Sequence, residues 1–96
     1  MNMVTRKDRE ALNKAVQALR SLNETKLFFH DLLSEREIQE IACRWKVARM
    51  IWKGTAYTKI IQETGLSSRT IARVARCVRK GAGGYKLILK REAKAR

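Results

Sequence analysis

Apolar residues recur along the first part of the chain with the spacing of α-helices. In residues 5–22 they follow one another at intervals of three and four, and Thr5 with Asp8 can cap the start of this helix. Asn23 is a plausible end, and a short second helix is expected over residues 24–32. The chain has no proline, and its five glycines separate the apolar segments. This pattern predicts an all-α protein of about six helices.

The third predicted helix, residues 34–54, is apolar on two sides. Ser34 and Glu37 can form a capping box at its start, and Gly54 can close its end. One face carries Ile38, Ile41, Ala42, Trp45, Ala48 and Trp52, and the other carries Cys43, Val47, Met50 and Ile51. A helix with two apolar faces packs between two partners. One partner is expected to be a second subunit; a helix covered on both sides by its own chain is the alternative.

Residues 55–81 have the pattern of a helix-turn-helix. A first helix over residues 56–64 is followed by Gly65, which can adopt the left-handed conformation that ends a helix sharply. Ser67 can then cap a second helix over residues 68–80. Two helices of these lengths around a Gly-x-Ser turn are typical of this DNA-binding motif.

The second helix of this motif has an apolar face and a basic face. The apolar face is formed by Ile71, Val74, Ala75 and Val78, and the basic face by Arg69, Arg73, Arg76 and Lys80. No acidic residue occurs between Gly65 and Lys86, so these like charges would repel one another in isolation. A DNA groove lined by phosphates explains their clustering; a solvated basic surface is the alternative.

The amino-terminal residues of such a helix are the ones that read bases. Arginine can bind guanine with two hydrogen bonds, whereas serine and threonine can contact bases or phosphates. Arginines and lysines farther along the helix are expected to meet phosphate. We therefore predict the following DNA-binding residues: Ser67, Ser68, Arg69, Thr70, Arg73, Arg76 and Lys80.

The charge distribution supports a polyanionic partner. Residues 1–43 hold seven basic and seven acidic side chains, whereas residues 44–96 hold fifteen basic and two acidic ones, so the second half carries the whole net charge of +13. Neutralising phosphates with release of counterions is the physical reason why such a surface binds nucleic acid. Double-stranded DNA is therefore the expected partner, with an anionic membrane surface as a distant second.

Other classes of function find little support in the sequence. The 96 residues suffice for a single helical domain. No apolar run could cross a membrane and the amino terminus has no signal-peptide core, so we expect a cytoplasmic protein without a membrane partner. Cys43, Cys77 and His30 are too few for a zinc site or a disulfide scaffold. No catalytic constellation is visible, so we expect neither an enzyme nor a required cofactor.

The stretch LSEREIQEIACRWKVARMIWKGTAYTKIIQETGLSSRTIARVARCVRKG resembles the central helices and reading head of the Trp-repressor-like family. The following GAGGYKLIL is similar to the YerC/YecD-type branch of that family. The resemblance implies an intertwined homodimer whose two reading heads face successive major grooves about 34 Å apart. The expected organisation is dimerisation helices over 5–54, the helix-turn-helix over 55–81, a carboxy-terminal helix over 82–90 and a basic tail over 91–96.

The resemblance also implies a pocket for tryptophan or another small-molecule effector. Arg44 and Arg73 match the two arginines that frame tryptophan in the repressor. Val74 stands where the repressor has glycine, and its side chain would occupy space near the indole. This departure argues against tryptophan as the effector and leaves Arg73 free to meet DNA.

Three functions follow from these features. The first is a sequence-specific transcriptional regulator that acts as a repressor by occupying an operator. The second is a nucleoid-type structural protein that binds DNA with little sequence preference, because the charge could supply affinity unaided. The third and weakest is a helix-turn-helix that tethers an enzyme.

Overall fold

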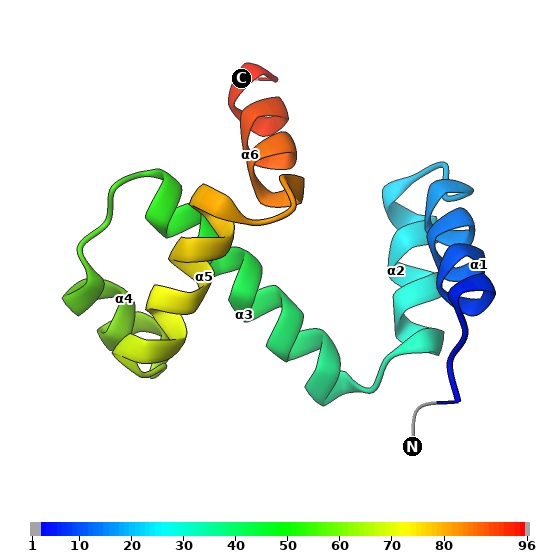
Figure 1. Ribbon diagram of the computed structural model, residues 1–96, viewed down its shortest axis with the longest axis horizontal. Coiled ribbons are helices and arrows are strands. Elements are labelled where there is room, and N and C mark those ends of the chain that lie inside the picture. Colours follow the sequence, from blue (N-terminus) through cyan, green and yellow to red (C-terminus); the bar gives the residue numbers. More distant parts are fainter. Residues whose placement is uncertain (1–2, 96) are drawn as a thin grey trace. The chain divides into compact units, whose positions relative to one another are not determined.

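The computed structural model describes residues 3–95, and their regular structure is entirely α-helical (Figure 1). The helices are α1 (Arg6–Gln17), α2 (Leu22–Leu32), α3 (Glu35–Trp52), α4 (Tyr57–Thr64), α5 (Ser68–Lys80) and α6 (Gly84–Lys94). The all-α prediction with about six helices is confirmed. The chain, expected from its length to form one domain, divides between Ile38 and Gln39 into two compact units, which are described in turn.

The first unit contains α1 and α2, and the boundary between them differs from the prediction. Helix α1 ends at Gln17 instead of Leu22, and α2 already begins at Leu22. The reason is a cap that the sequence analysis missed: the Ser21 hydroxyl accepts a hydrogen bond of 3.1 Å from the Glu24 N–H. Asn23, predicted to end the first helix, therefore lies in the first turn of α2.

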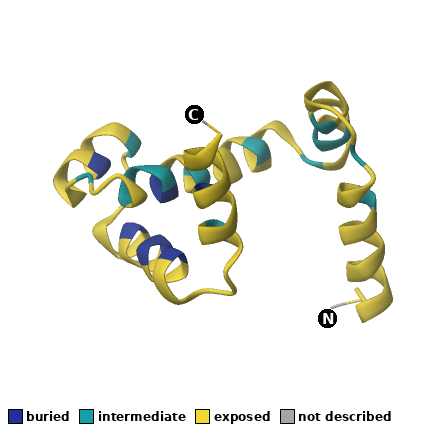
Figure 2. Cartoon of the chain, turned by 90° about the horizontal axis from the view of Figure 1, so that it is seen from above, coloured by how far each residue is buried: buried dark blue, intermediate teal, exposed yellow. Residues whose placement is uncertain are grey.

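The apolar side chains of the first unit are poorly covered. Helices α1 and α2 contain no buried residue, as their yellow and teal colouring shows (Figure 2). The exposed large apolar residues of these two helices are Leu12, Val16, Leu22, Leu27 and Leu32. Phe28 and Phe29 contact each other at a ring-centroid distance of 6.2 Å. A single copy of the chain thus leaves much of the apolar surface of this unit in water.

The predicted capping box at the start of α3 is confirmed. The Ser34 hydroxyl accepts a hydrogen bond of 3.2 Å from the Glu37 N–H, and the Glu37 carboxylate accepts one of 2.9 Å from the Ser34 N–H. The same exchange joins Thr5 and Asp8 at the start of α1. Hydrogen bonds from the backbone and then the side chain of Ser34 lower the pKa of Glu37, and those from Thr5 lower the pKa of Asp8.

We expect the capping box of α3 to weaken at acid pH. Because the pKa of Glu37 is lowered in the folded chain, its stabilising effect is full above the ordinary value of 4.5 and is lost as the pH falls through the lowered pKa. Replacing Ser34 with alanine should raise the pKa of Glu37 only partly, since the backbone donor remains. An NMR titration of the carboxylates measures this, and Asp8 serves as the internal control. A Glu37 pKa that Ser34→Ala leaves unchanged would contradict the assignment.

The second unit is built around a small apolar core shared by the later part of α3 and the three following helices. Its buried members are Val47, Ala48, Ile60, Ile71, Val74, Val78 and Leu89. The predicted apolar face of residues 68–80 is confirmed, because its four residues are all buried (Figure 2). Helix α5 packs against both α4 and α6 (Figure 1). This packing leaves the opposite side of α5 exposed.

The two predicted apolar faces of α3 are buried to different degrees. Val47 and Ala48, one from each face, are completely buried, and Trp45, Met50 and Ile51 pack partly against the core. Ile41 and Trp52 remain exposed on the first face. Within the second unit, the chain itself therefore covers part of both faces of α3.

The turn between α4 and α5 forms as predicted. Gly65 has a φ of 71°, in the left-handed region. The Thr64 hydroxyl donates a hydrogen bond of 2.7 Å to the carbonyl of Ile60 and accepts one of 3.2 Å from the Leu66 N–H. Leu66 packs partly against the core. After α5, the carboxy-terminal helix α6 extends to Lys94, beyond the predicted end at residue 90, so most of the expected basic tail is helical.

Candidate nucleic-acid interface

The start of α5 is held by a hydroxyl cap. The Ser67 hydroxyl accepts a hydrogen bond of 3.2 Å from the Thr70 N–H and lies 3.1 Å from the Thr70 hydroxyl. The Ser67 hydroxyl thus caps the start of the helix. Ser68 and Arg69 follow in the first turn, and their side chains are exposed. The cap fixes where the helix begins and therefore which residues stand at its exposed amino-terminal end.

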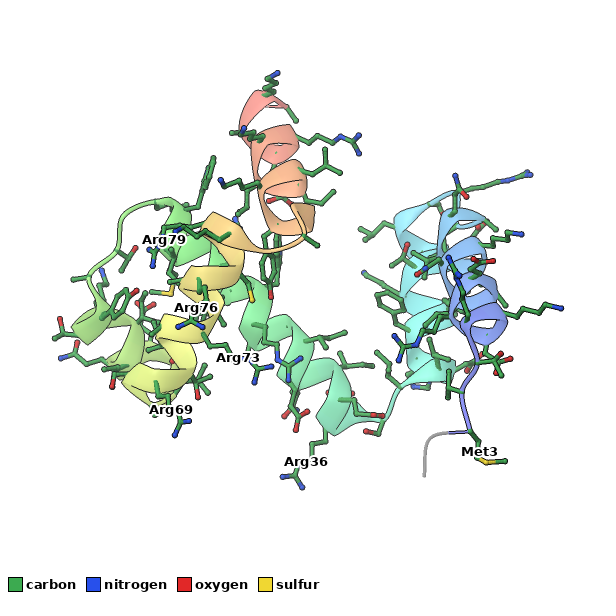
Figure 3. The ribbon with its side chains drawn as sticks, in the orientation of Figure 1. Met3, Arg36, Arg69, Arg73, Arg76 and Arg79 are labelled. Carbon is green, nitrogen blue, oxygen red and sulfur yellow. The ribbon has the colours of Figure 1, made fainter. Side chains whose placement is uncertain are left out.

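Four of the predicted DNA-binding residues surround one hollow on the exposed side of α5. The hollow has an open volume of about 450 Å³ and is lined by Arg69, Thr70, Ala72, Arg73 and Arg76. Figure 3 shows Arg69, Arg73 and Arg76 projecting from this helix. Ser67, Ser68 and Lys80 are exposed but do not line the hollow. The structure therefore gathers three guanidinium groups and one hydroxyl at the first two-thirds of α5.

Helix α5 itself carries no acidic residue. Between Gly65 and Lys86 the chain has no acidic residue. The Glu92 carboxylate of α6 forms an ion pair with Arg49 of α3, with Oε1 3.8 Å from the Arg49 Nε. Three arginines on consecutive turns then create a positive potential that a phosphate backbone would neutralise. Their guanidinium groups can also make paired hydrogen bonds to a guanine edge.

A second cavity of about 240 Å³ lies between α3, α5 and α6. Its lining residues are Arg44, Thr70, Arg73, Val74, Cys77 and Tyr85. The two arginines named from the family resemblance therefore lie at one cavity, although they are far apart in the sequence. Val74 also lines this cavity and is only 6% exposed, so its side chain occupies the inner wall.

The sequence analysis missed the aromatic contact beside this cavity. The rings of Trp45 and Tyr85 stack with their centroids 6.0 Å apart and an interplanar angle of 20°. Trp45 was assigned only to an apolar face of α3, and Tyr85 only to a family-like segment. Their contact joins residues forty positions apart, and no local periodicity could have revealed it.

Neither a metal centre nor a membrane segment is evident in the described part of the chain. Within residues 3–95, no three His, Cys, Asp or Glu side chains are grouped so as to hold a metal ion. Cys43 and Cys77 are free thiols. Over the same residues, none of the helices combines the length and apolar character needed to span a bilayer.

Comparison with known proteins identifies the family. Residues 7–93 match the family model of the Trp repressor protein. Protein YerC of Bacillus subtilis (strain 168), which is uncharacterised, is 42% identical over 85 residues, covering 88% of this chain and 82% of YerC.

Solved structures agree with this match. The crystal structure of a Trp repressor candidate from Staphylococcus aureus has a TM-score of 0.83 at 37% identity, covering 93% of this chain and 89% of its own. A TrpR-like protein from Eubacterium eligens has the same TM-score at 34% identity, covering 93% of this chain and 91% of its own. The chain therefore belongs to the Trp repressor protein family.

Proposed function

We propose that this protein is a transcriptional regulator that recognises specific DNA sites with α5. The observation that carries the proposal is the exposed arginine-lined hollow on a helix whose other face is buried in the core. Since burial of Ile71, Val74 and Val78 prevents the helix from rotating, Arg69 and Arg73 are presented in one direction. Arg69 and Thr70 stand near the amino-terminal end of the helix, where base contacts are made in this motif.

We propose further that two copies form an intertwined homodimer. The exposed leucines and Val16 of the first unit support this, because a second copy could remove them from water. A dimer would carry two copies of α5 related by a two-fold axis, and its operator would be an inverted repeat. Bound to an operator in the cytoplasm, such a dimer would block access of RNA polymerase and act as a repressor.

The first test selects DNA fragments of the source genome with the purified protein at ~150 mM salt, near physiological ionic strength. We expect a few sites that share an inverted repeat. Recovery spread evenly over the genome would overturn the proposed specificity. It would favour instead the nucleoid-type function, for which the net charge of +13 supplies the affinity. Selected sites without two-fold symmetry would contradict the dimer.

We infer that DNA binding does not require tryptophan, because the buried Val74 side chain lies in the wall of the cavity between Arg44 and Arg73. Adding L-tryptophan at millimolar concentration should therefore leave the affinity for a selected site unchanged. A fluorescence-anisotropy titration with labelled operator measures this, with another amino acid at the same concentration as the control. Tightening of binding by tryptophan alone would contradict the inference and assign the cavity to that ligand.

A further inference from the structure

Tyr85 is the first bulky side chain after the glycine-rich link between α5 and α6. The link consists of Gly81, Ala82 and Gly83, with Gly83 at a φ of 103°, and Gly84 is the first residue of α6. A segment of this composition restricts the direction of the following helix very little. The direction in which α6 leaves α5 is therefore set by the side chains that anchor it, beginning with Tyr85 and continuing with the buried Leu89.

The Tyr85 ring connects three helices. It stacks on Trp45 of α3, and both rings pack against the apolar core. It also lines the cavity whose other walls include Thr70, Arg73 and Val74 of α5. Thr70 and Arg73 line the DNA-facing hollow as well, so the two hollows share these residues. Tyr85 therefore borders two residues, Thr70 and Arg73, that also line the exposed hollow of α5.

We propose that Tyr85 is a positioning residue for DNA recognition. Its stack on Trp45 holds α6 against α3 and keeps the Tyr85 ring beside the part of α5 that carries Thr70 and Arg73, and this packing places Arg69 and Arg73 at the groove. This inference rests on the proposed function and names a residue on which the discrimination between DNA sites depends. Base contacts require side chains placed to within hydrogen-bond tolerance, whereas attraction of arginines to phosphates depends only weakly on angle.

The experiment compares Tyr85→Ala, Tyr85→Leu and Tyr85→Phe with the original protein. Each is made in a Trp52→Phe background, so that Trp45 is the remaining tryptophan and its fluorescence reports the stack. Affinities are measured for a genome-selected site and for random DNA of equal length at the same salt concentration. Circular dichroism during heating establishes that each variant is folded at the temperature of the titration.

We expect Tyr85→Ala and Tyr85→Leu to change the Trp45 emission and to weaken the selected site at least about tenfold, as loss of a good base contact does. Random DNA should be bound within about twofold of the original affinity, because the charges are unchanged. Tyr85→Phe, which keeps the ring, should restore both the emission and the preference. If Tyr85→Ala is unfolded, Tyr85→Leu, which keeps an apolar side chain, decides the question.

Three results would overturn the positioning role. The first is a folded Tyr85→Ala or Tyr85→Leu variant that still prefers the selected site over random DNA as strongly as the original protein. The second is an equal loss of affinity for the selected site and for random DNA. The third is a Tyr85→Phe variant that binds the selected site as weakly as Tyr85→Leu. If the original protein itself showed no preference for any site, the proposed function would fail, and Tyr85 would have no site preference to support. The two failures are thus distinguished by the behaviour of the unsubstituted chain.

Discussion

Replacing Arg69 with alanine should weaken binding to a selected operator by about 5- to 150-fold, which corresponds to the ~1–3 kcal/mol of a paired arginine–guanine contact. Arg69 is exposed in the first turn of α5 and lines the hollow of this helix, where we propose that its guanidinium group meets a base edge. Random DNA should lose much less affinity, because it loses only one positive charge. Competition titrations with operator and random DNA measure the two effects.

The matched control is Lys80→Ala at the other end of the same helix. Lys80 is exposed but does not line the hollow, so we expect it to meet phosphate. Its loss should weaken operator and random DNA about equally and reduce the slope of log affinity against log salt by ~1. An Arg69→Ala variant that behaved like Lys80→Ala would show that Arg69 does not contribute to discrimination between sites.

Replacing Ile60 with alanine should lower the free energy of unfolding by about 2–5 kcal/mol. The Ile60 side chain is 0% exposed and belongs to the core that joins α4 to α5. Its truncation removes buried methyl groups and leaves a cavity between these helices. Because native domains are stable by only ~5–15 kcal/mol, such a loss would remove a large share of the stability of this small chain. Urea unfolding followed by circular dichroism measures the change.

Ile61 provides the control for this prediction. It is the next residue of the same helix, but 36% of it is exposed, and the same substitution removes the same number of atoms. We expect Ile61→Ala to cost less than about 1 kcal/mol, because most surface substitutions have small effects. Equal losses for the two variants would mean that the core does not lie where the structure places it.

Local features explain why the bounds of α5 and the capping box of α3 could be predicted before the structure was known. Helix α5 has the predicted bounds because Ser67, Gly65 and the spacing of Ile71, Val74 and Val78 act within one or two turns. The capping box of α3 was predicted for the same reason. The start of α2 was missed, although Ser21 and Glu24 have the spacing of a cap, because the apolar pattern of α1 continued to Leu22.

The sequence by itself determined the helical class, the bounds of α5 and its basic face, since these depend on residues at most a few positions apart. Only the tertiary structure decided which hollow the arginines surround, that Arg44 lies at the same cavity as Arg73, and that Tyr85 stacks on Trp45. Those relationships depend on how α3, α5 and α6 pack. The glycine-rich link before Tyr85 provides no local rule that predicts the direction of α6. The position of α5 is therefore a property of the packed core, whereas its basic face is a property of the local sequence.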